Sequence, residues 1–177
     1  MTARIILSVS GSDRPGLTRA LADVVLAAGG NWLESHLSRL GGMYVGSVLV
    51  EIAPDAVAAL EAGARAIDAH GLAVSAVPAG EEPAVAAPGL GIELVGQDRP
   101  GIVSEVTRVL ADLGVNIEEL DTGIENGAWS GERLFRANLR VATPDGVNAD
   151  AVQRALETIS GDMMVDFTFG AGVAARV

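Results

Sequence analysis

An internal repeat constrains the fold of this chain more than any other feature. The segment Gly11-Ser-Asp-Arg-Pro-Gly16 returns 85 residues later as Gly96-Gln-Asp-Arg-Pro-Gly101. At the same offset Leu17 aligns with Ile102, Leu21 with Val106, Val24 with Val109, Gly29 with Gly114, Asn31 with Asn116 and Glu34 with Glu119. The sequence therefore predicts two copies of one small folding unit.

The second copy contains an insertion. Further along, residues 43–50 align with residues 134–141, at an offset of 91 rather than 85. The second copy therefore carries about six extra residues around Glu125 to Glu132, and these include Trp129. An aromatic residue between small polar ones suits a contact with a partner or a ligand, although loop packing is the commoner role.

Each copy has the pattern strand, helix, strand, strand, helix, strand. The alternation of Ile5, Leu7 and Val9 predicts the first strand, and apolar residues at helical spacing predict a helix whose first turn contains Pro15. Gly29 and Gly114 are placed to end the first helices. This order of elements predicts an α+β fold, with two ferredoxin-like βαββαβ domains in tandem. Each domain has a four-stranded antiparallel sheet and two helices on one face.

The domain boundaries follow from this pattern. We expect domain 1 at residues 1–77, a linker at 78–89, domain 2 at 90–170 and a C-terminal tail at 171–177. The linker is rich in proline, alanine and glutamate, a composition typical of a connecting segment.

The sheet face without helices differs between the copies. Its predicted residues are charged in copy two, namely Glu93, Arg136, Arg140 and Asp166, and apolar in copy one, namely Ile6, Val45 and Leu49. We therefore expect the face of copy one to be the more buried in an assembly.

The composition excludes several classes of function. Cysteine and lysine are both absent, which excludes disulfides, thiolate metal sites, cysteine nucleophiles, Schiff-base lysines and lysine-dependent phosphate loops. The net charge of −11 would repel a nucleic-acid backbone. We expect no metal, no cofactor and no direct binding of nucleic acid.

The N-terminus does not resemble a signal peptide, and no apolar stretch reaches the roughly 18 residues of a membrane span. We therefore expect a cytoplasmic protein with no membrane contact. Hydrophobic residues make up 49% of the chain and charged residues 20%, more apolar surface than a monomer easily hides. This favours association, expected as a homodimer, and leaves open whether domains pair within one chain or between chains.

The repeated turn suits binding of a free amino acid, which carries an ammonium and a carboxylate. Asp13 and Asp98 supply carboxylates. The N–H groups of a helix first turn, approachable at Gly16 and Gly101, can donate hydrogen bonds to an anion. Asn31 and Asn116 lie 18 residues after each Asp, and we expect them at the same sheet edge as the Asp. The competing interpretation is structural: an Asp cap, a Pro in the first turn and a Gly-x-Asn helix exit. Arg14 and Arg99 are expected to point to solvent or to pair with an acid.

These motifs together, a strand, Asp-Arg-Pro-Gly-(Leu/Ile), a helix and Gly-x-Asn in a doubled frame, resemble a tandem ACT-domain protein over nearly the whole chain. A freestanding pair is most similar to the glycine cleavage system transcriptional repressor family. The resemblance implies a non-catalytic regulator of amino-acid metabolism or its transcription. Such a regulator binds an amino acid, glycine by resemblance, and acts through a protein partner.

In that family the ligand often lies between ACT domains. The resemblance implies ten ligand-binding residues: Ser12, Asp13, Gly16, Leu17 and Asn31 in copy one, and Gln97, Asp98, Gly101, Ile102 and Asn116 in copy two. Some members have a histidine where this chain has Gly11 and Gly96, and many have Asn in place of its Asp.

Other functions fit the sequence less well. His36 lies in a strand pattern, His70 ends a helix, and neither has a motif partner for catalysis. An acylphosphatase would need a phosphate-binding loop where this chain has an Asp. An RNA-recognition domain would expose aromatic residues, but Tyr44 and Phe135 fall in the inward register, and Trp32 is expected to pack half-buried. The remaining alternative is a structural or assembly ACT module without a ligand.

Overall fold

The computed structural model describes residues 1–68, 71–80, 89–126, 132–159 and 164–169. The chain divides into two units, Met1–Glu82 and Pro83–Val177, which we describe separately. Residues 81–88 of the predicted linker (78–89) and the tail at 171–177 lie outside the described residues, as do His70 and Trp129.

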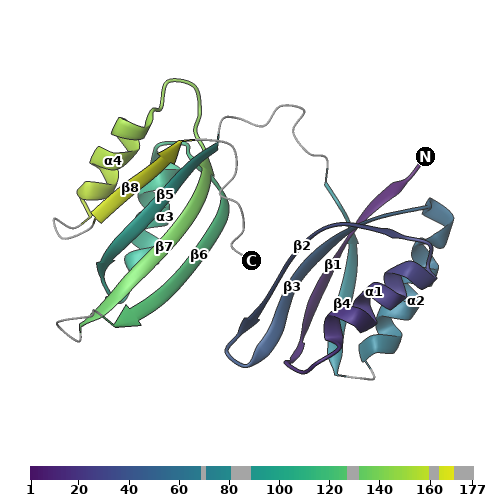
Figure 1. Ribbon diagram of the computed structural model, residues 1–177. Coiled ribbons are helices and arrows are strands. Elements are labelled where there is room, and N and C mark those ends of the chain that lie inside the picture. Colours follow the sequence, from purple (N-terminus) through teal and green to yellow (C-terminus); the bar gives the residue numbers. More distant parts are fainter. Residues whose placement is uncertain (69–70, 81–88, 127–131, 160–163, 170–177) are drawn as a thin grey trace. The chain divides into compact units, whose positions relative to one another are not determined.

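Unit 1 is a single antiparallel sheet with two helices on one face (Figure 1). Its elements are β1 (Ala3–Ser12), α1 (Leu17–Ala27), β2 (Asn31–Leu40), β3 (Met43–Ile52), a 3-10 turn (Pro54–Ala56), α2 (Val57–Asp68) and β4 (Leu72–Pro78). The strands lie in the order β2-β3-β1-β4, so β2 and β4 are the edges.

Unit 2 repeats this arrangement with the strand order β6-β7-β5-β8. Its elements are β5 (Gly89–Gln97), α3 (Ile102–Asp112), β6 (Asn116–Asn126), β7 (Arg133–Ala142), α4 (Ala149–Glu157) and β8 (Met164–Phe169). Even the irregularities recur, because β2 bulges between Trp32 and Glu34 and β6 between Ile117 and Glu119. The predicted pair of βαββαβ domains is confirmed.

Each unit has its own core between its sheet and its helices. In β1 the alternate residues Ile5, Leu7 and Val9 are buried, as the period of two predicts. In β7 the residues Phe135, Ala137, Leu139 and Val141 are buried in the same way. Leu21 of α1 and Leu110 of α3 pack onto these strands from the helix side. The inward register expected for Phe135 is confirmed, and Tyr44 and Trp32 pack half-buried against the core of unit 1.

The first helix of each unit begins later than the sequence predicts. Pro15 and Pro100 lie in the preceding turn, and the helices begin at Leu17 and Ile102. The reason is the glycine after each proline: Gly16 and the corresponding Gly101 have φ values of 95° and 90°, a left-handed conformation that cannot lie inside a helix. The glycine is therefore the N-cap of each helix.

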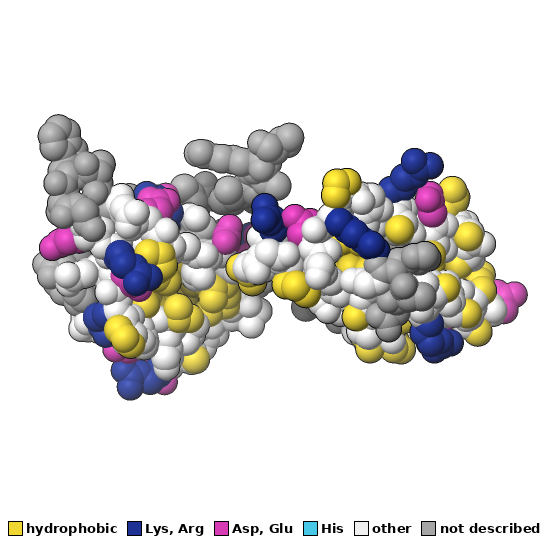
Figure 2. Space-filling model, turned by 90° about the horizontal axis from the view of Figure 1, so that it is seen from below, with side chains coloured by type: hydrophobic (Ala, Val, Ile, Leu, Met, Phe, Trp, Pro, Cys, Tyr) yellow, Lys and Arg dark blue, Asp and Glu magenta, His cyan; other side chains and the backbone are white. Residues whose placement is uncertain are grey.

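The sheet face without helices, which we call the open face, carries different side chains in the two units. In unit 2 Arg136 pairs with Glu93 and with Glu125, whose Oε1 lies 3.1 Å from Arg136 Nε. The corresponding residue of β3 in unit 1 is Val45, which is half-buried like its neighbours Ile6 and Leu49. Figure 2 shows acidic and basic side chains side by side on the surface of unit 2. The side chain of Asp166 lies outside the described residues.

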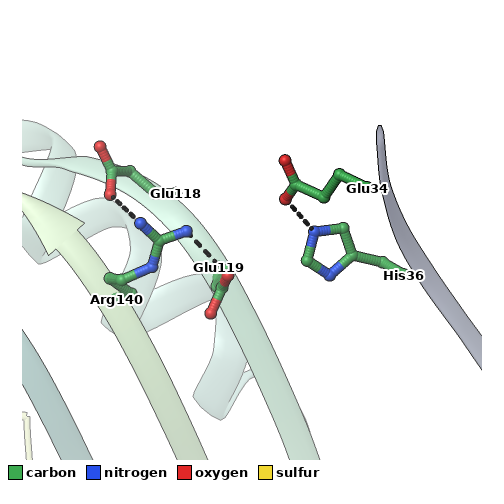
Figure 3. A network of polar contacts seen from close by, with 5 residues as sticks. All are labelled: Glu34, His36, Glu118, Glu119 and Arg140. Carbon is green, nitrogen blue, oxygen red and sulfur yellow. Dashed lines mark hydrogen bonds and ion pairs between the residues drawn. The ribbon is translucent and has the colours of Figure 1, made fainter. Parts of the chain in front are cut away.

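The acidic residues of β6 also pair with arginine. Arg140 Nη1 lies 3.0 Å from Glu118 Oε2, and Arg140 Nη2 lies 2.7 Å from Glu119 Oε1 (Figure 3). These ion pairs join the edge strand β6 to the neighbouring strand β7. No helix within the described ranges has the length and apolar character needed to span a membrane.

Candidate functional site

The Asp-bearing loop after the first strand is held by the same backbone bond in both units. In unit 1 the N–H of Asp13 donates to the carbonyl oxygen of Gly42 at 3.2 Å. In unit 2 the N–H of Asp98 donates to the carbonyl oxygen of Arg133 at 2.9 Å. Gly42 and Arg133 are aligned residues of the repeat, so this bond is a shared feature of the duplicated fold.

Each Asp carboxylate forms an ion pair with an arginine, but the two arginines come from different strands. Asp13 Oδ2 lies 3.3 Å from Arg39 Nε, near the end of β2. Asp98 Oδ2 lies 3.2 Å from Arg133 Nη2, at the start of β7. The side chains of Asp13 and Asp98 remain 34% and 22% exposed, so both can still be reached from solvent. Neither Asp caps a helix, since both N-cap positions are glycines without a side-chain cap bond.

Arg39 and Arg133 could not be found from the repeat, because the two arginines do not align with each other. At the offsets of the repeat, Arg39 corresponds to Ile124 and Arg133 to Gly42. The available signal was weaker: each arginine lies within three residues of the turn or insertion that joins the second and third strands. That connection meets the Asp loop only in the folded sheet.

The arginine next to each Asp behaves differently in the two units. Arg99 donates from Nη1 and Nη2 to the two carboxylate oxygens of Glu105, at 2.8 and 2.6 Å. This bidentate hydrogen bond raises the pKa of Arg99 and lowers that of Glu105. In unit 1 the position of Glu105 is Ala20, and Arg14 is exposed. The expectation of an acid partner is thus confirmed for Arg99, and exposure to solvent is confirmed for Arg14.

The residues after the glycines belong to the cores. The side chains of Leu17 and Ile102 are each only 4% exposed and pack between helix and sheet. Only their backbone groups can take part in a surface site. Ser12 and Gln97, at the ends of β1 and β5, are exposed beside the Asp loops.

Asn31 and Asn116 do not lie at the same sheet edge as the Asp loops, contrary to the expectation. Asn31 is level with Glu51, which is paired with Arg4 at the start of β1, whereas Asp13 follows the end of β1. Nine residues of strand separate the two ends, about 30 Å. The reason is that α1 runs back along the sheet, so β2 enters beside the beginning of β1. Asn116 is likewise level with Ala142 and Gly89, at the far end of unit 2 from Asp98.

A hollow of about 560 Å³ opens at the Asp loop of unit 2. It is lined by Gln97, Asp98, Arg99, Pro100, Glu132 and Arg133. A hollow on unit 1 lies elsewhere, over β1 and β4, where Ser8, Ser10 and Ser75 line it. The hollow of unit 2 therefore brings two acidic and two basic side chains together, and its lining includes the predicted site residues Gln97 and Asp98.

The candidate catalytic and metal-binding residues form no such cluster. His36 is an exposed residue of β2, as expected, and its Nε2 lies 2.9 Å from Glu34 Oε1 of the same strand (Figure 3). Across the described parts of the chain, no three His, Asp or Glu side chains are grouped so that they could hold a metal ion.

Comparison with known proteins identifies the fold family. Family models described as ACT domain match residues 3–76 and residues 91–160. No curated protein matches the sequence.

Two solved structures resemble the chain over its whole length. An unknown protein from Galdieria sulphuraria has a TM-score of 0.77 and 29% identity, covering 97% of this chain and 100% of that one. A candidate glycine cleavage system transcriptional repressor has a TM-score of 0.70 and 18% identity, covering 97% and 99%. The second similarity is one of fold. ACT domains are regulatory, ligand-sensing domains, and this chain belongs to the ACT-domain family as a tandem of two.

Proposed function

We propose that this protein is a non-catalytic amino-acid sensor that regulates amino-acid metabolism or its transcription through a protein partner. The observation that carries the proposal is the Asp loop, which both ACT domains hold in place by a backbone bond and an ion pair. A loop held in this way is preorganised for a ligand, because less conformational freedom is lost on binding.

The chemistry of the loop suits an amino acid. Asp13 and Asp98 are accessible acceptors for an ammonium group. The first turns of α1 and α3 have no side-chain cap, so their N–H groups can receive a carboxylate. The Asp carboxylate itself repels phosphate but attracts an ammonium group, which favours an amino acid over a nucleotide or an acyl phosphate.

The distance between the Asp loop and the Asn of the same domain limits which residues one ligand can contact. A ligand that contacts both must be held by two ACT folds, since one fold places them about 30 Å apart. Such a ligand would stabilise one arrangement of domains, and that arrangement would select the protein partner. Glycine as the ligand, a homodimer as the assembly and a cytoplasmic location remain predictions of the sequence.

Isothermal titration calorimetry of the whole chain with each of the twenty common amino acids tests this function. We expect heat of binding and a raised Tm with at least one of them. Asp13→Ala and Asp98→Ala, made singly, should then weaken that binding at the loop that is used. If neither substitution changed the heat of binding, the Asp loops would not be part of the ligand site. If no amino acid gave heat or a Tm shift, the chain would be an assembly module.

A further inference from the structure

We propose that Arg133 binds the carboxylate of the amino-acid ligand in the hollow beside Asp98, and that this makes the loop of unit 2 the stronger of the two sites. This inference rests on the proposed amino-acid-sensing function, and it adds a residue outside the repeated motif. It also assigns the two charges of the ligand to two named side chains.

The position of Arg133 is fixed by two contacts with the same residue. Its carbonyl oxygen accepts the N–H of Asp98 at 2.9 Å, and its Nη2 lies 3.2 Å from Asp98 Oδ2. Its side chain is nevertheless 67% exposed and lines the hollow. A guanidinium has five N–H donors, and within the described residues the pair with Asp98 engages only one of its nitrogens. Arg133 therefore has donors left for a second anion.

Arg99, the other arginine of the hollow, is already occupied. Both of its terminal nitrogens donate to Glu105, which holds the guanidinium against the first turn of α3. Replacing that bidentate pair with a ligand carboxylate would leave Glu105 without its partner. Of the two arginines in the hollow, Arg133 is thus the better carboxylate receptor.

The Asp98–Arg133 pair complements a zwitterion. An amino acid places an ammonium and a carboxylate a few ångströms apart, on the scale of this ion pair. If the ligand places its ammonium beside Asp98 and its carboxylate beside Arg133, the four charges alternate in sign and each has an opposite charge beside it. Binding of a neutral zwitterion also leaves the net charge of the site unchanged. A simple amine or a simple carboxylate could satisfy only half of this pair.

Unit 1 lacks this arrangement. The residue aligned with Arg133 is Gly42, which has no side chain, and Asp13 is paired instead with Nε of Arg39 from β2. Position 20 is alanine, so no acid corresponding to Glu105 holds Arg14 against α1. Arg39→Gln is therefore the matched variant for unit 1, because it removes an exposed arginine paired with the equivalent Asp.

The test is calorimetry on the full chain in mildly acidic buffer. The probes are the twenty common amino acids and, for each one that binds, its amide, which keeps the ammonium but loses the carboxylate. We expect Arg133→Gln to weaken amino-acid binding by about tenfold to a hundredfold, because it removes hydrogen bonds between charged groups. Arg133→Lys should retain part of the affinity. Arg39→Gln should weaken binding less than Arg133→Gln does, because the loop of unit 2 is the stronger site.

The amide separates a direct contact from a merely structural role. If Arg133 binds the carboxylate, the wild-type protein prefers the acid to the amide, and Arg133→Gln reduces that preference. An unchanged preference in Arg133→Gln would overturn the inference and leave the sensor function intact. An equal loss in Arg39→Gln would overturn the assignment to unit 2. No binding of any amino acid to the wild type would refute both the function and the inference. Circular dichroism of each variant checks that the fold is retained.

Discussion

The two ACT domains differ in the arginine that pairs with the Asp of the repeated loop. Each holds the loop by the same backbone bond, yet the arginine that neutralises the Asp comes from β2 in domain 1 and from β7 in domain 2. The open faces differ as well, since Val45 of domain 1 corresponds to the ion-paired Arg136 of domain 2. Where the fold requires a contact, the copies agree. Where the surface is free to vary, they have diverged, and the second loop has become the one with a charged hollow.

The largest expected effect on stability comes from substitutions in the cores, because each domain has a core of its own. Leu7 of β1 and Leu94 of β5 are both 0% exposed, in separate cores. Leu94→Ala should destabilise domain 2 by about 3–5 kcal/mol and leave domain 1 unchanged, because the cavity it creates touches only one core. Leu7→Ala should do the reverse. Hydrogen exchange of peptides from each domain measures both, and loss of protection in both domains at once would show one cooperative unit instead.

A smaller effect is expected where the central strands differ by a single methyl group. Gly46 of β3 has a φ of 147°, and a Cβ there would lie 1.9 Å from the carbonyl oxygen of His36. The aligned residue of β7 is Ala137, which is buried. Gly46→Ala should therefore cost domain 1 about 1–3 kcal/mol or more through strain in the β2–β3 pairing. Ala137→Gly should cost domain 2 no more than about 1 kcal/mol. Urea unfolding compares the two, and equal losses would contradict the difference in backbone geometry.

The open faces provide the third prediction. If the half-buried, apolar face of domain 1 is covered in an assembly, Val45→Arg should raise the dissociation constant at least about tenfold, because it would bury a charge without a partner. Arg136→Val removes only exposed ion pairs and should leave association unchanged. Sedimentation velocity over a concentration series measures both. Dissociation by Arg136→Val alone would mean that the charged face of domain 2 is the covered one.

The smallest effect concerns the pH dependence of the Arg99–Glu105 pair. The guanidinium lowers the pKa of Glu105, so the pair stabilises domain 2 at pH values above the ordinary glutamate pKa. This contribution is lost as the pH falls through the lowered pKa, where the folded protein also binds the proton. Glu105→Gln should thus reduce the stability of domain 2 slightly at neutral pH and not in acid.

Urea unfolding of wild type and Glu105→Gln at several pH values checks this sign. Ala20→Glu in domain 1, which places an acid at the equivalent position near Arg14, should introduce the same pH dependence there. A difference between wild type and Glu105→Gln that grew in acid would refute the assignment.

The sequence predicted the elements of the fold because they depend on local patterns. The alternation in β1 and β7 and the helical spacing after each Asp-Arg-Pro-Gly turn are properties of a few consecutive residues. The predicted start of each helix was about two residues too early, also for a local reason. Proline favours a first helical turn, but the left-handed glycine after it excludes one.

The candidate site was less predictable. Asp13 and Asp98 are accessible carboxylates in loops held by ion pairs. Their distance from Asn31 and Asn116 depends on the direction in which α1 and α3 cross the sheet. The structure also explains one departure from the family pattern. A Cβ at Gly11 would lie 2.4 Å from the carbonyl oxygen of Gly71, so the start of β4 leaves no room there for a histidine.

By itself the sequence determined the duplication, the order of elements, the buried faces and the two Asp loops, because repetition and periodicity are written along the chain. Only the tertiary structure decided which arginine meets each Asp, and which end of the sheet receives each Asn. Arg133 reaches Asp98 from β7, which pairs with β5, and Arg39 reaches Asp13 from β2, which is separated from β1 by β3. Contacts of that kind arise from pairing between strands, which no local pattern encodes.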